Sequence, residues 1–178
     1  RRQSALRPDL SLETALWEQG LERVAGLDEA GRGALAGPVA AAVLILPIDA
    51  TLAEKLHGVR DSKQMTPAER KIWAVRLRRL AVAWSVGFAS HAEVDALGIL
   101  PATRLAMQRA LAALSPPPQH LLIDHLLLPE VEIPQTALTK GDARSFSIAG
   151  ASILAKTARD ALLVALEDEF PGYGFKAH

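Results

Sequence analysis

The 178-residue sequence contains no cysteine, and this absence excludes disulfides and thiolate metal sites. Any metal must therefore be held by oxygen or imidazole, which favours hard cations such as magnesium or manganese. The five histidines show no metal-ligand spacing, and the helical pattern H-E-x-x-H is absent. The sequence therefore does not favour a zinc hydrolase.

An excess of charge of either sign is also lacking. Lysine plus arginine and aspartate plus glutamate both total 20, so the formal net charge is zero. This balance argues against a protein that binds nucleic acid by bulk charge alone, although it allows local basic patches. The longest strongly apolar run, residues 39–46, is far shorter than the roughly 20 residues that span a bilayer, and residues 1–20 have no apolar signal core. We expect a cytoplasmic protein with no membrane association.

Hydrophobic residues make up 49% of the chain and charged residues 22%, which is typical of one soluble globular domain. Residues 1–8 are expected to be a loose tail. A short helix is expected over residues 10–21, with Ser11 as its cap and with Glu13 and Glu18 on its solvent side.

Apolar periodicity and turn residues predict an alternation of strands and helices. A helix is expected from Thr66, where Glu69 completes a capping box. A second capping box at Ser90 and Glu93 opens another helical stretch, which Pro101 is expected to split. The predicted strands cover residues 23–27, 39–46, 83–89, 120–124 and 136–139, and the last predicted helix covers residues 145–170. This order favours an α/β fold, a mixed sheet flanked by helices.

The segment VAGLDEAGRGALAGPV, residues 24–39, carries an acidic pair at the end of an apolar strand. Asp28 and Glu29 could hold divalent cations, which hydrolyse phosphodiesters by generating hydroxide and stabilising the attacking and leaving oxygens. Adjacent strand residues point to opposite faces, so the pair shares one site only if the strand ends or twists there. The alternative is a strand-ending turn with two solvated acids. The glycines of this segment match a dinucleotide fingerprint poorly, because their spacing is G-x-G-x-x-x-G and a strand follows.

Two further aspartates are candidates for the same site. Asp124 ends the apolar strand HLLID, and strand carboxyl ends are where sites assemble in open α/β sheets. Asp142 follows Lys140 and Gly141 just before the long helix. The alternatives are a turn-forming aspartate at 124 and a helix-entry acid at 142 that the helix dipole favours.

Three side chains are candidates for phosphate contacts. Lys63 lies in Asp61-Ser62-Lys63, and Ser152 and Lys156 lie four residues apart on one helix face. The alternative for each lysine is an ordinary solvated surface position.

Together these segments resemble the ribonuclease HII family. The resemblance covers residues 24–178 and rests on seven blocks in the family's order: GLDEAGRG with AGPV, DSKQMTPAER, ILPATRLAMQRAL, LLID, TKGDARS, ASILAKTARD and FPGYGFKAH. It implies a ribonuclease H-like fold with a mixed five-stranded sheet, over residues 21–178, preceded by a tail or short helix over residues 1–20.

The resemblance also implies a site and a reaction. Asp28, Glu29, Asp124 and Asp142 would be the catalytic residues and the ligands of Mg²⁺ or Mn²⁺. The loop of Gly31, Arg32 and Gly33 would lie against the ribonucleotide and help sense its 2′-hydroxyl, the group that distinguishes RNA from DNA. The expected reaction is endonucleolytic hydrolysis of RNA in RNA–DNA hybrids and at ribonucleotides embedded in duplex DNA, leaving 5′-phosphate and 3′-hydroxyl ends. We expect a monomer whose partners are RNA–DNA hybrids and duplex DNA that contains ribonucleotides. Alternatives are a non-catalytic hybrid-binding module and, more distantly, a mononucleotide-binding α/β protein.

The sequence departs from the family pattern at two places. The aspartate of LLID is usually followed by glycine in the family, and here it is followed by His125. Beyond the position of His178 the family continues with Lys-Gly-Tyr and a helical tail, and we expect this tail, with its junction-recognising tyrosine, to be absent. The expectation is metal binding with poor cleavage at single-ribonucleotide junctions.

Overall fold

The computed structural model describes residues 7–34 and 37–169, without the side chains of residues 168 and 169. Its strands are β1 (Val24–Ala30), β2 (Val39–Ile45), β3 (Ala83–Ala89), β4 (His120–Asp124) and β5 (Gln135–Leu138). Its α-helices are α1 (Ser11–Trp17), α2 (Leu52–Lys55), α3 (Pro67–Leu80), α4 (His91–Leu97), α5 (Ile99–Ala113) and α6 (Phe146–Glu169). Two 3₁₀ turns, η1 (Ser62–Gln64) and η2 (Gly141–Ala143), precede α3 and α6.

The strands form one five-stranded sheet in the order β3-β2-β1-β4-β5. The β1–β2 and β2–β3 pairs are antiparallel, whereas the β1–β4 and β4–β5 pairs are parallel. The mixed sheet flanked by helices that the sequence predicted is therefore confirmed. Because β1 lies at the junction of the two halves, its carboxyl end is next to that of β4.

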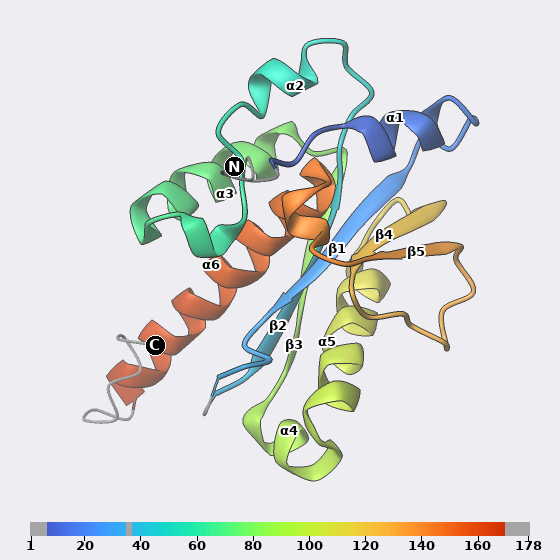
Figure 1. Cartoon of the computed structure of the whole chain (residues 1–178). Helices are drawn as coiled ribbons and strands as arrows, with labels where there is room; N and C mark the ends of the chain where they lie inside the picture. Colours follow the sequence, from blue (N-terminus) through green and yellow to red (C-terminus); the bar gives the residue numbers. More distant parts are fainter. Residues whose placement is uncertain (1–6, 35–36, 170–178) are drawn as a thin grey trace, which may run out of the picture.

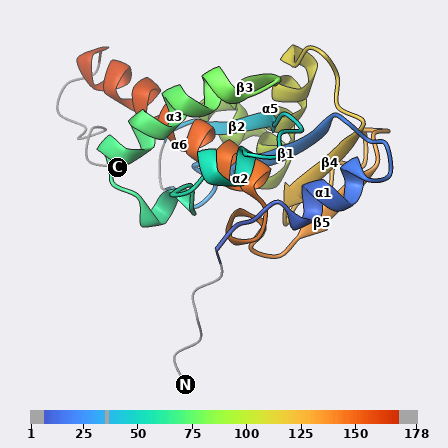
Figure 2. The ribbon, with the colours of Figure 1, turned by 90° about the horizontal axis from the view of Figure 1, so that it is seen from above.

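Helices cover both faces of the sheet (Figure 1). Alternate residues of β2 face opposite sides: Val43 belongs to the core under α5, and Leu44 to the core under α6 and α3. Helix α1 packs through Leu12 and Leu16 against the cluster that contains Leu122 of β4, and Figure 2 shows it beside β4 and β5. Full burial on both faces explains why β2 is a continuous apolar run.

Glycine at one position lets α6 approach β1 closely. A Cβ added to Gly26 would lie 2.1 Å from the backbone carbon of Ser147 and 2.4 Å from the backbone nitrogen of Ile148. No residue with a side chain fits in that space without moving the helix. The start of α6 is thereby fixed against the strand that carries Asp28 and Glu29.

Several boundaries differ from the sequence prediction. Strand β1 continues past residue 27 to Ala30, so its acidic pair lies within the strand. The helical stretch breaks at Gly98, whose φ is 84°, and not at Pro101. Pro101 is tolerated in the first turn of α5 because backbone N–H groups there have no intrahelical acceptor. Ser11 is the first residue of α1 and provides no cap; its backbone N–H donates to the Asp9 carboxylate.

Both predicted capping boxes are present, at Thr66 with Glu69 and at Ser90 with Glu93. No helix within residues 7–34 and 37–169 combines the length and the apolar character that crossing a bilayer requires.

Candidate active site

The carboxyl ends of β1 and β4 bring two of the predicted acids together. In the parallel register Leu27 pairs with Ile123, so Asp28 and Asp124 are the next residues along two neighbouring strands. Asp28 is only 5% exposed, and its Oδ1 accepts a hydrogen bond of 2.8 Å from the backbone N–H of Glu29. Asp28 therefore lies beside Asp124, near the carboxyl ends of both strands.

The turn η2 adds Asp142 to this corner. The backbone N–H of Gly141 donates to Oδ1 of Asp124 over 2.6 Å, which ties the turn to the end of β4. Lys140 enters the turn in the left-handed conformation, with φ 56°. Asp142 is buried at the edge of the same pocket.

Helix α1 supports the segment that follows Asp142. Glu13 is fully buried, which contradicts its predicted solvent position. Its Oε1 accepts hydrogen bonds from Ser145 Oγ at 2.5 Å and from the N–H and Oγ of Ser147 at 2.9 and 2.6 Å. The serine hydroxyls and the free N–H at the start of α6 offset the cost of burying this carboxylate. The sequence could not reveal this pairing because more than 130 residues separate the partners.

The four acids line one pocket of about 540 Å³. Its lining residues are Asp28, Glu29, Arg32, Asp61, Lys63, Gln64, Asp124, His125, Lys140, Asp142 and Ala143. Basic groups sit at its rim: Arg32 Nη1 lies 3.1 Å from Glu29 Oε1, and Lys63 Nζ lies 3.9 Å from Asp142 Oδ2. The pocket thus combines buried and half-buried acids with more exposed cations.

Burial and mutual repulsion raise the pKa values of three of the acids. The pKa of Asp28 lies well above its ordinary value, first because of desolvation and then because Glu29 and Asp124 are close. Burial raises the pKa of Glu29, against an opposing effect of Arg32. Burial, Asp61 and Asp124 raise the pKa of Asp142. A bound cation would reverse each of these shifts, so the site is electrostatically suited to one.

The donor set fits a hard divalent cation. All four acids offer oxygen only, which suits magnesium or manganese. Oε2 of Glu29 is buried and has no hydrogen-bond partner. A buried acceptor without a donor is costly, and a cation would satisfy it. In the part of the chain that the structure describes, however, no three acidic or histidine side chains are already grouped closely enough to hold an ion.

Not every predicted contact residue reaches the pocket. Ser152 is buried in α6, and its Oγ lies 2.8 Å from Oγ of Ser62, so it joins η1 to α6. Lys156 pairs with Asp160 over 2.7 Å. Neither lines the pocket. Their proposed contacts with substrate stay predictions, and the positions favour a supporting role.

The two glycines of the predicted loop, Gly31 and Gly33, differ in how closely they are packed. Gly31 has φ 102°, and a Cβ there would meet the Arg159 side chain at 2.4 Å, so close packing requires glycine. Gly33 has open space around it. Neither lines the pocket, whereas Arg32 between them does.

Several residues that line the pocket were not predicted from sequence as site residues, among them Asp61, Gln64 and Lys140. Asp61 could have been recognised from its place beside Lys63. His125 has φ 61°, a left-handed conformation that glycine adopts without strain. This conformation is a physical reason for the glycine that the family usually has there.

Comparison with known proteins identifies the family that this chain resembles. A family model described as ribonuclease HII matches residues 25–178. The ribonuclease HII of Synechococcus sp. (strain JA-3-3Ab) is 51% identical over 97% of this chain and 77% of its own length. The ribonuclease HII of Moorella thermoacetica is 52% identical over 91% of this chain and 77% of its own length.

Solved structures agree as well. Ribonuclease H2 from Pyrococcus horikoshii OT3 superposes with a TM-score of 0.73 and 27% identity, over 85% of this chain and 79% of that one. A Bst ribonuclease HIII in complex with Mn²⁺ has the same fold, with a TM-score of 0.70 and 20% identity, over 95% of this chain and 61% of that one. The alternative of a non-catalytic hybrid-binding module is not favoured by these relatives. The chain belongs to the ribonuclease HII family, whose members are endonucleases that hydrolyse RNA in RNA–DNA hybrids.

Proposed function

We propose that Asp28, Glu29, Asp124 and Asp142 form the catalytic metal site of this endoribonuclease. The observation that carries the proposal is the convergence of all four acids on one pocket, with a buried and unpartnered Oε2 on Glu29. Asp28 and Asp124 would be the main ligands of Mg²⁺ or Mn²⁺, because they lie side by side near the carboxyl ends of two adjacent parallel strands. Glu29 and Asp142 would complete the site. Bound divalent ions supply activation of the attacking water and neutralisation of charge on the phosphate.

The protein's own groups prepare this site before metal binds. Burial and mutual repulsion hold the pKa values of Asp28 and Glu29 above their ordinary range. The hydrogen bond from the backbone N–H of Gly141 holds Oδ1 of Asp124 in place.

The exposed cations at the rim would hold the substrate. Arg32 is 38% exposed in its side chain and lies between two glycines, so its guanidinium can reach a ribonucleotide backbone near the 2′-hydroxyl. Lys63 is far more exposed, with 81% of its side chain accessible, and would contact a neighbouring phosphate. We extend the substrate range to single ribonucleotides in duplex DNA, cut on their 5′ side.

One experiment tests the assignment directly. A labelled DNA duplex with one ribonucleotide and a matched all-RNA hybrid are incubated with the chain and Mg²⁺ or Mn²⁺, and products are resolved on a gel. We expect cleavage that leaves 3′-hydroxyl ends and that Asp124→Asn abolishes. Full activity of Asp124→Asn would remove this residue from the site. The expected monomeric state and cytoplasmic location stay predictions.

A further inference from the structure

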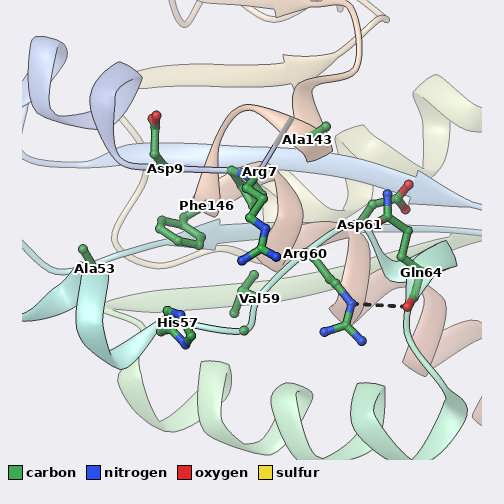
Figure 3. Close-up of a pocket in the computed structure, with 12 residues that line it drawn as sticks. Arg7, Asp9, Ala53, His57, Val59, Arg60, Asp61, Gln64, Ala143 and Phe146 are labelled. Carbon is green, nitrogen blue, oxygen red and sulfur yellow. Dashed lines mark hydrogen bonds between the residues drawn. The ribbon is translucent and has the colours of Figure 1, made fainter. Parts of the chain in front are cut away.

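A second cavity adjoins the proposed catalytic pocket. It has a volume of about 570 Å³, and it shares Asp61, Gln64 and Ala143 with the catalytic pocket. Its other walls come from the N-terminal segment before α1, from the loop that follows α2, and from the start of α6 at Phe146 (Figure 3). A volume in this range is typical of a ligand site.

Two arginines and a histidine face this cavity. Figure 3 shows the guanidinium of Arg7 pointing toward Val59, between Phe146 and Arg60. Arg7 is exposed and has no hydrogen bond or ion pair to another described residue. Arg60 is held by Gln64 O at 3.2 Å and by Glu69 Oε1 at 2.9 Å. Nη1 of Arg60 makes no hydrogen bond to another described residue. His57 also lines the cavity. Among the described residues, no acid forms an ion pair with Arg7, and Glu69 pairs with only one of the two terminal nitrogens of Arg60.

The acids that line the cavity already have backbone partners. Asp9 accepts hydrogen bonds from the N–H and Oγ of Ser11 at 2.8 and 2.5 Å, and Figure 3 shows its carboxylate pointing away from Arg7. Asp61 accepts from the backbone N–H of Lys63 at 2.9 Å. Because these hydrogen bonds hold both carboxylates in local turns, the arginines remain available to an anion from outside the protein.

The wall that carries Arg7 is anchored to the catalytic region. Asp9 forms a β-bridge with Ser145, and Asp9 O accepts from the N–H of Phe146 over 3.0 Å. Glu13, four residues further on, fixes the same segment through Ser145 and Ser147. Arg7 is therefore two residues from a fixed point next to the turn that bears Asp142.

Resting on the proposed function, we propose that this cavity binds a backbone phosphate of the hybrid duplex, next to but distinct from the phosphate that is cut. A duplex is continuous, so its backbone must pass over the surface beside the catalytic pocket. Guanidinium groups match phosphate oxygens in charge and in hydrogen-bond geometry. Base stacking is disfavoured because Phe146, the aromatic group nearest Arg7 in Figure 3, is only 8% exposed. Arg7 precedes residue 25, where the match to the family model begins.

The test measures binding of a labelled RNA–DNA hybrid over a range of salt concentrations, in EDTA so that no hydrolysis occurs. Each phosphate contact contributes about 0.7–0.9 to the slope of log K against log salt. Arg7→Ala should lower the slope by about this amount. When salt is raised from roughly 50 to 200 mM, the affinity of both proteins falls, and the factor by which it falls should be about three times smaller for the variant than for the unaltered chain. Arg7→Lys should keep most of the slope, because it keeps the charge. Arg79→Ala is the matched control, since Arg79 lies in the last turn of α3 and lines neither pocket.

Shortened duplexes locate the contact. Base pairs are removed one at a time from each end of the duplex. For the unaltered chain, the slope of log K against log salt should drop at the length at which the contacted phosphate is lost. For Arg7→Ala, no drop is expected at that length. A slope for Arg7→Ala equal to those of the unaltered chain and of Arg79→Ala would overturn the inference. If the unaltered chain cleaves the hybrid under that outcome, the proposed function stands and only the second phosphate site fails. If it neither binds nor cleaves hybrid in Mg²⁺, the proposed function itself fails.

Discussion

Replacing Gly26 by alanine should displace α6 from the strand that carries the acidic pair. The added Cβ would lie 2.1 and 2.2 Å from the carbonyl carbon and oxygen of Ser147, and 2.4 Å from the nitrogen of Ile148. All three are backbone atoms of α6, so no rotation of a side chain relieves the contact. Either the helix or the strand must move.

The size of the effect follows from this geometry. Overpacking a core costs typically 1–3 kcal/mol, and contacts to backbone on a central helix place Gly26→Ala at about 3 kcal/mol or more. The lower entropy of the unfolded alanine chain offsets only about 0.4–1 kcal/mol of this. For a domain of this length, a destabilisation of about 2–3 kcal/mol lowers the melting temperature by roughly 4–12 °C.

Thermal unfolding followed by circular dichroism measures the change, with Gly150→Ala as the matched control. A Cβ at Gly150 would lie 2.4 Å from Leu44 Cδ2, the end of a side chain that can rotate, and alanine gains about 1 kcal/mol of helix propensity there. We expect Gly150→Ala to melt within a few degrees of the unaltered chain, and Gly26→Ala well below it, with weaker cleavage even where it is folded. A Gly26→Ala variant as stable as the Gly150→Ala variant would refute the close approach of α6 to β1.

Four further predictions concern the site itself. Asp28→Asn or Asp124→Asn should abolish cleavage on gels. The pKa of Asp28 is higher in the folded protein than in the unfolded chain. Without metal, the folded protein therefore loses stability as the pH rises from the ordinary pKa of an aspartate to the raised pKa of Asp28. Asp28→Asn lacks this loss and should melt at or above the unaltered chain at neutral pH, and a clearly lower value would contradict the buried charge. Magnesium or manganese should support cleavage and calcium should not, because calcium–oxygen bonds are about 2.3–2.6 Å long and magnesium–oxygen bonds about 2.0–2.1 Å. Equal cleavage rates with calcium and with magnesium would count against a closely spaced metal site. Arg32→Ala should weaken hybrid binding, measured by anisotropy, and change stability by less than about 0.5 kcal/mol, whereas lost stability with unchanged binding would make it structural. His125→Gly should stabilise the fold by about 0.5–1 kcal/mol in denaturant titrations because it relieves a left-handed φ of 61°, and a destabilised variant would show that the imidazole makes a compensating contact.

Local patterns in the sequence determined most of the framework. Strand 83–89 and both capping boxes depend on residues close together in the chain, and each is present as predicted. The placement of Asp28 and Asp124 at one corner also follows in part from sequence, since both lie toward the carboxyl ends of apolar strands, although β1 continues two residues past Asp28. Parallel pairing of the two strands then brings the acids together.

The tertiary structure alone decided which side chains face the pocket and which support it. Glu13 looked like a solvent-facing helix residue, but packing of α1 on the start of α6 buries it against Ser145 and Ser147. Ser152 was predicted to contact phosphate; the structure buries it in α6 beside Ser62, and the contact itself stays a prediction. These pairings join segments between 90 and 134 residues apart. Helical and strand periods describe only the neighbours of a residue along the chain. The partner of a polar side chain across the core depends on how close two elements lie, and Gly26 sets that distance for α6.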